Sequence, residues 1–158
     1  MSIGIFPGRF QPFHNGHLMV IQGMANLCSE VHVVISVDAT EAMYSVEKVR
    51  EMISGALLNE GLTDVFIQAV EVSEDDGEWL DAVLEVAEGK DGVVIWSGRD
   101  DVIELCEANG VETKRVTHVP GIDGEEIRDL ITAGDSAWRS KVPGATIDVV
   151  TAPGGDRQ

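Results

Sequence analysis

The chain has 158 residues, 44% of them hydrophobic, so we expect one packed domain at residues 1–150 followed by a flexible tail at residues 151–158. Lys and Arg number 11 against 28 Asp and Glu, and the formal net charge of −17 argues against nucleic acid or an anionic membrane as a partner. Such an acidic surface suits a very salty cytoplasm, where salt screens repulsion between like charges, so we expect a halophilic source; an ordinary acidic protein is the alternative.

Stretches with strand and helix spacing alternate along the chain. In chain order they predict a strand at residues 3–6, a helix at 16–27, a strand at 31–37, a helix at 45–58, a strand at 64–70, a helix at 78–87, a strand at 92–96, a helix at 100–108, a strand at 112–118 and a helix at 124–132. A short turn capped by Ser136 and a last element at 144–150 follow. Repeated β–α units predict an α/β fold, a Rossmann-like, doubly wound parallel sheet of about five strands.

The loop after the first predicted strand, residues 8–17, reads Gly-Arg-Phe-Gln-Pro-Phe-His-Asn-Gly-His and has the parts of a phosphate site. Gly8 allows close approach to the backbone, and Arg9 offers a planar fork to an anion. His14 and His17 are three residues apart near a helix start, so both can face one side and donate hydrogen bonds to phosphate oxygens. The alternative is half of a zinc site, which would need further ligands.

This ten-residue motif resembles the signature of the HxGH nucleotidylyltransferase superfamily, in the form typical of archaeal-type nicotinamide-nucleotide adenylyltransferases. The resemblance covers roughly residues 2–150. It implies an enzyme that transfers AMP from ATP to nicotinamide mononucleotide, giving NAD and pyrophosphate, with Mg²⁺ accompanying ATP. It also suggests a homo-oligomer.

Cys28 and Cys106 are expected to be reduced thiols of a cytoplasmic protein.

The resemblance also assigns roles to individual residues. It gives catalysis to His17, His14, Arg128 and Arg9, with His17 as the stronger donor to the transition state. For ATP binding it implies the motif residues and a second group near residues 98–128, namely Gly8, Arg9, Phe10, His14, Gly16, His17, Gly98, Gly124, Ile127 and Arg128. No metal ligand is assigned.

A second anion site is expected at residues 121–128, Gly-Ile-Asp-Gly-Glu-Glu-Ile-Arg, at a predicted helix start. This stretch resembles the family's second signature, in which hydroxyls and an arginine hold the β- and γ-phosphates. Asp123 and Glu125 stand where the family has serine and threonine. The two carboxylates could cap the helix, help to place Mg²⁺ or potassium, or mark a site that no longer turns over ATP.

Two other stretches are candidates for substrate contacts. Trp79 lies in a stretch where the archaeal-type enzymes have a tryptophan that stacks on the nicotinamide ring; a tryptophan at the rim of the core is the alternative. Ser97-Gly98-Arg99 resembles the family's Ser-Gly-Asn, which borders the adenosine pocket. Arg99 could reach a phosphate or pair with a neighbouring aspartate.

Other functions stay open at this stage. The altered second signature, and a loop at residues 38–43 shorter than the family usually has, are compatible with an adenylyl- or cytidylyltransferase that uses another phosphorylated acceptor. They are equally compatible with a homologue that binds nucleotides without reacting. A fold by itself does not separate these alternatives.

Overall fold

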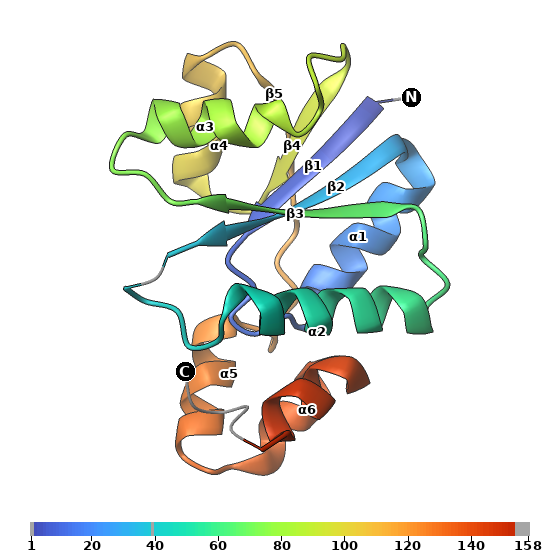
Figure 1. Ribbon diagram of the computed structural model, residues 1–158, viewed down its shortest axis with the longest axis vertical. Helices are drawn as coiled ribbons and strands as arrows, with labels where there is room; N and C mark the ends of the chain where they lie inside the picture. The colour runs from blue at the N-terminus through green and yellow to red at the C-terminus, as the bar shows by residue number, and fades with distance from the viewer. Residues whose placement is uncertain (1, 39, 154–158) are drawn as a thin grey trace.

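Five strands form one parallel sheet in the computed structural model, which describes residues 2–38 and 40–153 (Figure 1). Their order in space is β3-β2-β1-β4-β5, and every neighbouring pair is parallel. The chain starts in the middle of the sheet, builds outward to β3 and then returns to β4 on the other side of β1. This reversal opens a crevice at the carboxyl ends of β1 and β4. The strands are β1 (Ser2–Gly8), β2 (Cys28–Val37), β3 (Val65–Glu71), β4 (Val93–Ser97) and β5 (Glu112–Arg115).

Helices cover both faces of the sheet, as the doubly wound prediction requires (Figure 1). One face carries α1 (Asn15–Leu27) and α2 (Val46–Asn59), and the other carries α3 (Asp76–Glu85) and α4 (Asp100–Ala108). The first layer is extended by the last elements of the chain, which are α5 (Gly124–Thr132), the 3₁₀ helix η1 (Ser136–Lys141) and α6 (Gly144–Thr151).

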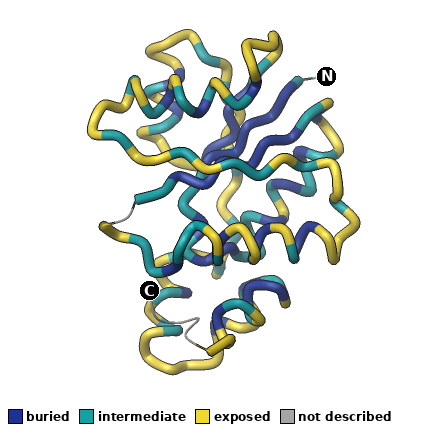
Figure 2. The backbone as a smooth tube through the Cα atoms, in the orientation of Figure 1, coloured by how far each residue is buried: buried dark blue, intermediate teal, exposed yellow. Residues whose placement is uncertain are grey.

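Alternation along β2 explains how one strand serves two cores. Val31, Val33 and Ile35 pack into the cluster under α1 and α2, whereas Val34 packs into the cluster under α3 and α4. Figure 2 shows the central strands buried along most of their length, with more exposure along the edge strand β3. Parallel strands covered on both faces favour apolar runs such as Val33-Val34-Ile35; in β2 this run is flanked by the buried polar residues His32 and Ser36.

Three boundaries differ from the sequence-based expectations. The strand expected at 112–118 ends at Arg115, because β4 ends at Ser97 and the last ladder pair is Ser97 with Arg115. η1 is capped by Asp135, which accepts from the Ala137 amide at 2.9 Å, and not by Ser136. Of the expected tail, residue 151 still belongs to α6, and residues 154–158 lie outside the described residues.

Local residues mark the ends of several helices. Ser45 caps α2 by accepting from the Lys48 amide at 3.3 Å. Gly110 and Gly134 follow α4 and α5 with φ of 71° and 73°, the left-handed conformation expected after a helix end. In the part of the chain that is described, no helix is both long and apolar enough to cross a membrane.

Candidate active site

A pocket lies at the carboxyl ends of β1, β4 and β5, where the crevice of the fold is expected. Four segments line it: the motif loop with the start of α1, residues 97–99, residues 116–119, and the start of α5. We call it the central pocket. Of the residues that the sequence assigns to ATP, all but Ile127 line it, namely Gly8, Arg9, Phe10, His14, Gly16, His17, Gly98, Gly124 and Arg128.

The two histidines are locked together at the start of α1. His14 Nδ1 accepts hydrogen bonds from the amides of Gly16 (3.0 Å) and His17 (3.3 Å), so the imidazole is the N-cap. His17 Nδ1 in turn accepts from the His14 amide at 3.1 Å. The rings stack with centroids 3.5 Å apart and 14° between planes. Because both Nδ1 atoms accept, each neutral ring carries its hydrogen on Nε2, the atom left to donate to a ligand.

Both imidazoles are neutral at pH 7. Burial lowers the pKa of His14 from 6.5 to about 4, with further lowering by His118 and Arg128 and an opposing effect of Asp123. Burial lowers the pKa of His17 well below its ordinary value, and electrostatic interaction with the neighbouring imidazole of His14 lowers it further. The pair therefore offers two N–H donors to an anion without the desolvation cost of a buried charge.

Aromatic rings hold His17 in place. Phe10 meets its ring edge-on with centroids 4.8 Å apart, and Phe13 stacks on it at 5.5 Å. Phe10 is 1% exposed and adopts a left-handed φ of 55°. A Cβ at Gly8 would lie 2.9 Å from Phe10 Cζ. Glycine at position 8 is therefore required by the packing of this ring, a reason that the sequence does not reveal.

The two candidate arginines are in different situations. Arg128 reaches back from α5 and donates through Nη1 to the carbonyl oxygen of Gln11 at 3.0 Å, which ties the second signature to the motif loop. Arg9 is held by carboxylates of the loop after β2, with Nη1 2.5 Å from Glu41 Oε2 and Nη2 3.6 Å from Asp38 Oδ2. Arg9 lines the central pocket, but its guanidinium is already paired.

The replaced residues of the second signature begin α5. Asp123 is its N-cap and accepts from the Glu125 amide at 3.3 Å, as the capping interpretation expects. Asp123 and Glu125 both line the central pocket. Ile127 is 0% exposed and lies in the hydrophobic core, so its expected contact with ATP is not seen. Its place in the helix turns it toward the core, and Arg128, the next residue, faces the pocket.

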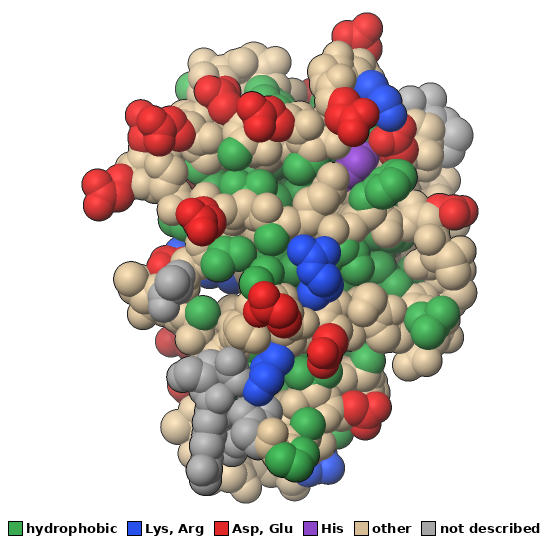
Figure 3. Space-filling view, viewed as in Figure 1, with side chains coloured by type: hydrophobic (Ala, Val, Ile, Leu, Met, Phe, Trp, Pro, Cys, Tyr) green, Lys and Arg blue, Asp and Glu red, His purple; other side chains and the backbone are tan. Residues whose placement is uncertain are grey.

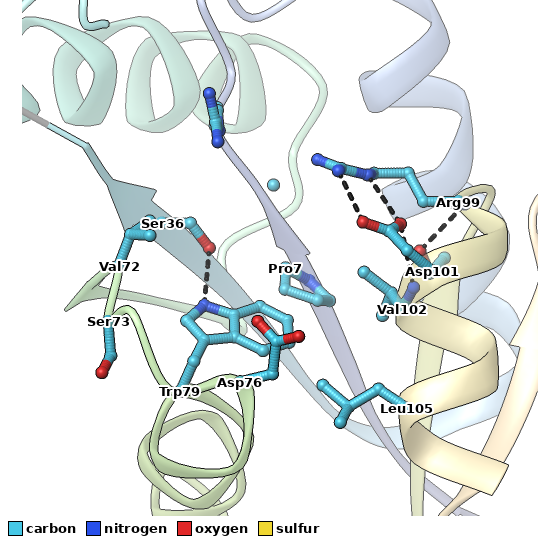
Figure 4. Close-up of a pocket in the computed structure, with 13 residues that line it drawn as sticks. Pro7, Ser36, Val72, Ser73, Asp76, Trp79, Arg99, Asp101, Val102 and Leu105 are labelled. Atoms are coloured by element: carbon cyan, nitrogen blue, oxygen red, sulfur yellow. Dashed lines mark hydrogen bonds and ion pairs between the residues drawn. The ribbon is translucent and has the colours of Figure 1, made fainter. Parts of the chain in front are cut away.

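A second pocket adjoins the first across the end of β1, and we call it the Trp79 pocket (Figure 4). It shares Pro7, Gly8, Arg9, Ser97 and Arg99 with the central pocket. Trp79 forms one wall and is held by a hydrogen bond from its Nε1 to Ser36 Oγ at 3.2 Å. Arg99 stands on the opposite wall and is paired with Asp101, as one of the two expectations for it stated.

Three functional residues were missed from the sequence. Gln11 fastens the motif loop to the start of α2, accepting from the amides of Met43 (2.9 Å) and Tyr44 (2.7 Å). Ser36 is the hydrogen-bond partner of Trp79. The sequence feature that could have pointed to it is a serine within the apolar stretch of β2. His118, which the sequence placed in a strand, lines the central pocket and lowers the pKa of His14.

A zinc site would need several ligands close together in space. Within residues 2–38 and 40–153, no group of three or more His, Cys, Asp or Glu side chains could hold a metal ion.

A Cβ at Gly98 would lie 3.2 Å from the carbonyl oxygen of Val116. Glycine at this position therefore lets the loop after β4 lie close to the loop after β5, and both Gly98 and Val116 line the central pocket.

Sequence comparisons agree with this geometry. Residues 5–70 match the Cytidylyltransferase-like family. The nicotinamide-nucleotide adenylyltransferase of Methanolobus tindarius is 31% identical, over 95% of this chain and 88% of its own length. The enzyme of the same name from Halobacterium salinarum is 32% identical, over 95% of this chain and 86% of its own length.

Solved structures share the fold. A bifunctional NMN adenylyltransferase/ADP ribose pyrophosphatase from Francisella tularensis superposes with a TM-score of 0.73 at 23% identity, over 84% of this chain and 42% of that chain. The nicotinic acid mononucleotide adenylyltransferase of Plasmodium falciparum, complexed with NaAD, superposes with a TM-score of 0.65 at 16% identity, over 94% of each chain. Together with the motif geometry and the relatives above 30% identity, this leads to one conclusion: the chain belongs to the nicotinamide-nucleotide adenylyltransferase family.

Proposed function

We propose that this protein transfers AMP from ATP to nicotinamide mononucleotide, giving NAD⁺ and pyrophosphate. The observation that carries the proposal is the locked pair of neutral imidazoles, which leaves two Nε2–H donors in a pocket beside Arg128. A phosphate oxygen of the acceptor attacks the α-phosphorus of ATP, and the bond from that phosphorus to the bridging oxygen breaks. No covalent nucleophile is needed, because catalysis comes from positioning and from stabilising the charge on the leaving pyrophosphate.

Four side chains of the central pocket have roles in the proposed reaction. His17 and His14 donate to oxygens between the α- and β-phosphates, where negative charge grows. Arg128 clamps the β- and γ-phosphates, and its bond to the Gln11 carbonyl orients it toward the motif loop. Arg9 joins the clamp when ATP displaces its pairing with Glu41 and Asp38, which is an exchange of one anion for another.

The two adjoining pockets fit the two substrates. The central pocket takes ATP, and the Trp79 pocket takes the pyridine ring of the acceptor, which stacks its cationic ring on the indole for about 1–2 kcal/mol. Gly8 and Arg9 lie between the pockets, where the acceptor phosphate must meet the α-phosphorus. An aromatic wall next to the phosphate site favours an acceptor with a flat ring over a flexible phosphorylated alcohol.

Mg²⁺ is proposed to arrive with ATP. The central pocket offers the carboxylates of Asp123 and Glu125 as hard oxygen ligands, fewer than an octahedral ion needs. Asp123 or Glu125 would supply an oxygen ligand to an ion held mainly by ATP and water. The bound ion supplies charge neutralisation on the pyrophosphate. We further propose a cytoplasmic location, a salty environment and a homo-oligomeric state.

An acceptor panel tests the proposal. Purified protein with ATP and Mg²⁺ in concentrated potassium chloride would receive nicotinamide mononucleotide, nicotinate mononucleotide or phosphopantetheine separately. Pyrophosphate release with a pyridine mononucleotide, together with dinucleotide formation, is expected. Release with phosphopantetheine alone would transfer the proposal to another acceptor. A folded protein that binds ATP without releasing pyrophosphate with any acceptor would favour the non-catalytic alternative.

A further inference from the structure

The wall opposite Trp79 carries a solvent-exposed ion pair between Arg99 and Asp101. Arg99 donates to Asp101 through Nε (3.1 Å to Oδ1) and Nη2 (2.8 Å to Oδ2), in the bidentate arrangement that arginine forms with a carboxylate. The two side chains are 64% and 66% exposed. An ion pair this exposed to solvent contributes little to the stability of the fold. What it does change is the charge presented to the pocket.

Asp101 is well fixed as the partner of Arg99. Its Oδ1 also accepts from the Val102 amide at 2.9 Å, at the start of α4. Burial acts to raise the pKa of Asp101, but the hydrogen bond and charge of Arg99 outweigh it and hold the pKa below its ordinary value. Asp101 is therefore ionised at neutral pH. In Figure 4 the two side chains point toward each other beside Val102, across the pocket from the indole.

The cations that could meet a carboxylate in this pocket are already paired. Among the described residues that line the Trp79 pocket, Arg9 and Arg99 are the basic ones. Arg9 is paired with Glu41 and Asp38, and in the proposed reaction it exchanges these carboxylates for the phosphates of ATP; Arg99 is paired with Asp101. Asp76 adds a carboxylate next to the indole (Figure 4). A cationic pyridine ring with a neutral substituent suits these surroundings, whereas a ring bearing a carboxylate meets excess negative charge.

We propose that the Arg99–Asp101 ion pair determines which form of pyridine mononucleotide the pocket accepts: Asp101 occupies the guanidinium of Arg99, so the pocket selects the carboxamide form and rejects the carboxylate form. The inference rests on the proposed function, since it assumes a pyridine ring in the Trp79 pocket. Specificity here comes from electrostatic repulsion between the pocket carboxylates and the carboxylate form of the mononucleotide. Releasing Arg99 should then create a binding site for the carboxylate.

The test compares Asp101→Asn with Asp100→Asn. Asp100 is the preceding residue in the first turn of α4, is paired with Arg115 at 2.9 Å and is not among the pocket's lining residues, so its variant has the same loss of charge. For each protein, kcat/KM is measured with nicotinamide mononucleotide and with nicotinate mononucleotide. Asp101→Asn should raise the ratio of acid-form to amide-form kcat/KM about tenfold, the gain from one charge-assisted hydrogen bond. Asp100→Asn should leave the ratio unchanged.

A double variant and a binding measurement complete the test. Arg99→Gln combined with Asp101→Asn should lose the gain, because the freed guanidinium is then absent. An Asp101→Asn ratio equal to that of the wild type or of Asp100→Asn would overturn the inference while leaving the proposed function intact. Calorimetric Kd values for both mononucleotides distinguish a failure of this inference from a failure of the proposed function. If the protein binds neither mononucleotide, the proposed function and the inference are both wrong; if it binds them without turnover, the same tenfold change is expected in the ratio of Kd values.

Discussion

At the start of α1, the imidazoles of His14 and His17 both cap the helix and offer hydrogen-bond donors to a ligand. Through Nδ1 they close the capping box of the helix, and that bonding leaves each Nε2–H as a donor in the central pocket. A helix N-terminus already attracts anions through unpaired amides, but here His14 takes up two of those amides. The donors offered to phosphate are therefore largely side-chain groups, which makes catalysis sensitive to substitution of the histidines.

His17 is expected to be the more important donor. His17→Ala removes an Nε2–H that acts on charge developing in the transition state, so kcat should fall about a hundredfold or more. Steady-state rates of NAD⁺ formation measure this. Since the ring also contacts Phe10 and Phe13, His17→Asn serves as a second variant, with circular dichroism and a thermal melt to show that both remain folded. An unchanged kcat in a folded variant would remove His17 from the mechanism.

Single residues also show where sequence reasoning stops. Spacing predicts that His14 and His17 share a side, and the structure confirms it. Spacing does not reveal that Arg9 turns toward Glu41, because that contact joins residues 32 positions apart across a loop. Nor does it reveal that Ser36 holds Trp79, a pairing of residues 43 apart that exists only once β2 and α3 are packed together.

At the scale of elements, the helix α1 should respond to pH through its cap. Burial lowers the pKa of His14 from 6.5 to about 4, so between these values the unfolded chain binds a proton that the folded chain does not. The free energy of unfolding should therefore fall as the pH falls through this window. The contribution of the neutral His14 to stability is fully present above pH 6.5. Protonation of Nδ1 would also abolish the cap, because a protonated ring has no acceptor.

The variant His14→Asn isolates this effect. Asparagine is a strong N-cap but does not titrate, so stability should change less between about pH 7 and about pH 5 than in the wild type. Urea unfolding of the wild type and of His14→Asn at the two pH values gives the comparison. Equal pH dependence in wild type and His14→Asn would mean that the cap is not the titrating group.

Elements with local signals were predicted most accurately. The expected helices at 100–108 and 124–132 have the same bounds as α4 and α5, since Gly110 and Gly134 mark their C-terminal ends in the sequence itself. The strand expected at 112–118 is shorter, because a strand ends where its neighbour ends, and β4 stops at Ser97. Ile127 shows the same limit in a helix: a motif position predicts contact with ATP, whereas the turn of α5 places the side chain in the core.

For the whole molecule, the large negative net charge is expected to affect stability. Acidic side chains are spread over the face shown in Figure 3, with few basic ones among them, in line with a net charge of −17. Like charges repel in the compact state more than in the unfolded chain. Salt shortens the range of that repulsion, so the stability of this protein should depend on ionic strength more than that of a neutral domain.

Raising potassium chloride from about 0.2 M to about 2 M should raise the midpoint of thermal unfolding, because screening removes the repulsion among the excess carboxylates. Differential scanning calorimetry measures the midpoint. The same concentrations of a salt with a different monovalent cation provide the control, since screening depends on ionic strength and not on the identity of the ion. A midpoint that stays constant or falls would contradict adaptation to a salty environment.

The order β3-β2-β1-β4-β5 connects these scales, because it brings the motif loop, the loop after β4 and the start of α5 to a single crevice. Adenylyl transfer in that crevice requires attack at the α-phosphorus. We would therefore incubate the protein with Mg²⁺, nicotinamide mononucleotide and ATP labelled at the α-phosphorus, in concentrated potassium chloride, and follow the label by chromatography. Label in NAD⁺ together with unlabelled pyrophosphate is the expected result. Label that stays in ATP, or leaves as free AMP or ADP with no dinucleotide formed, would contradict adenylyl transfer by this protein.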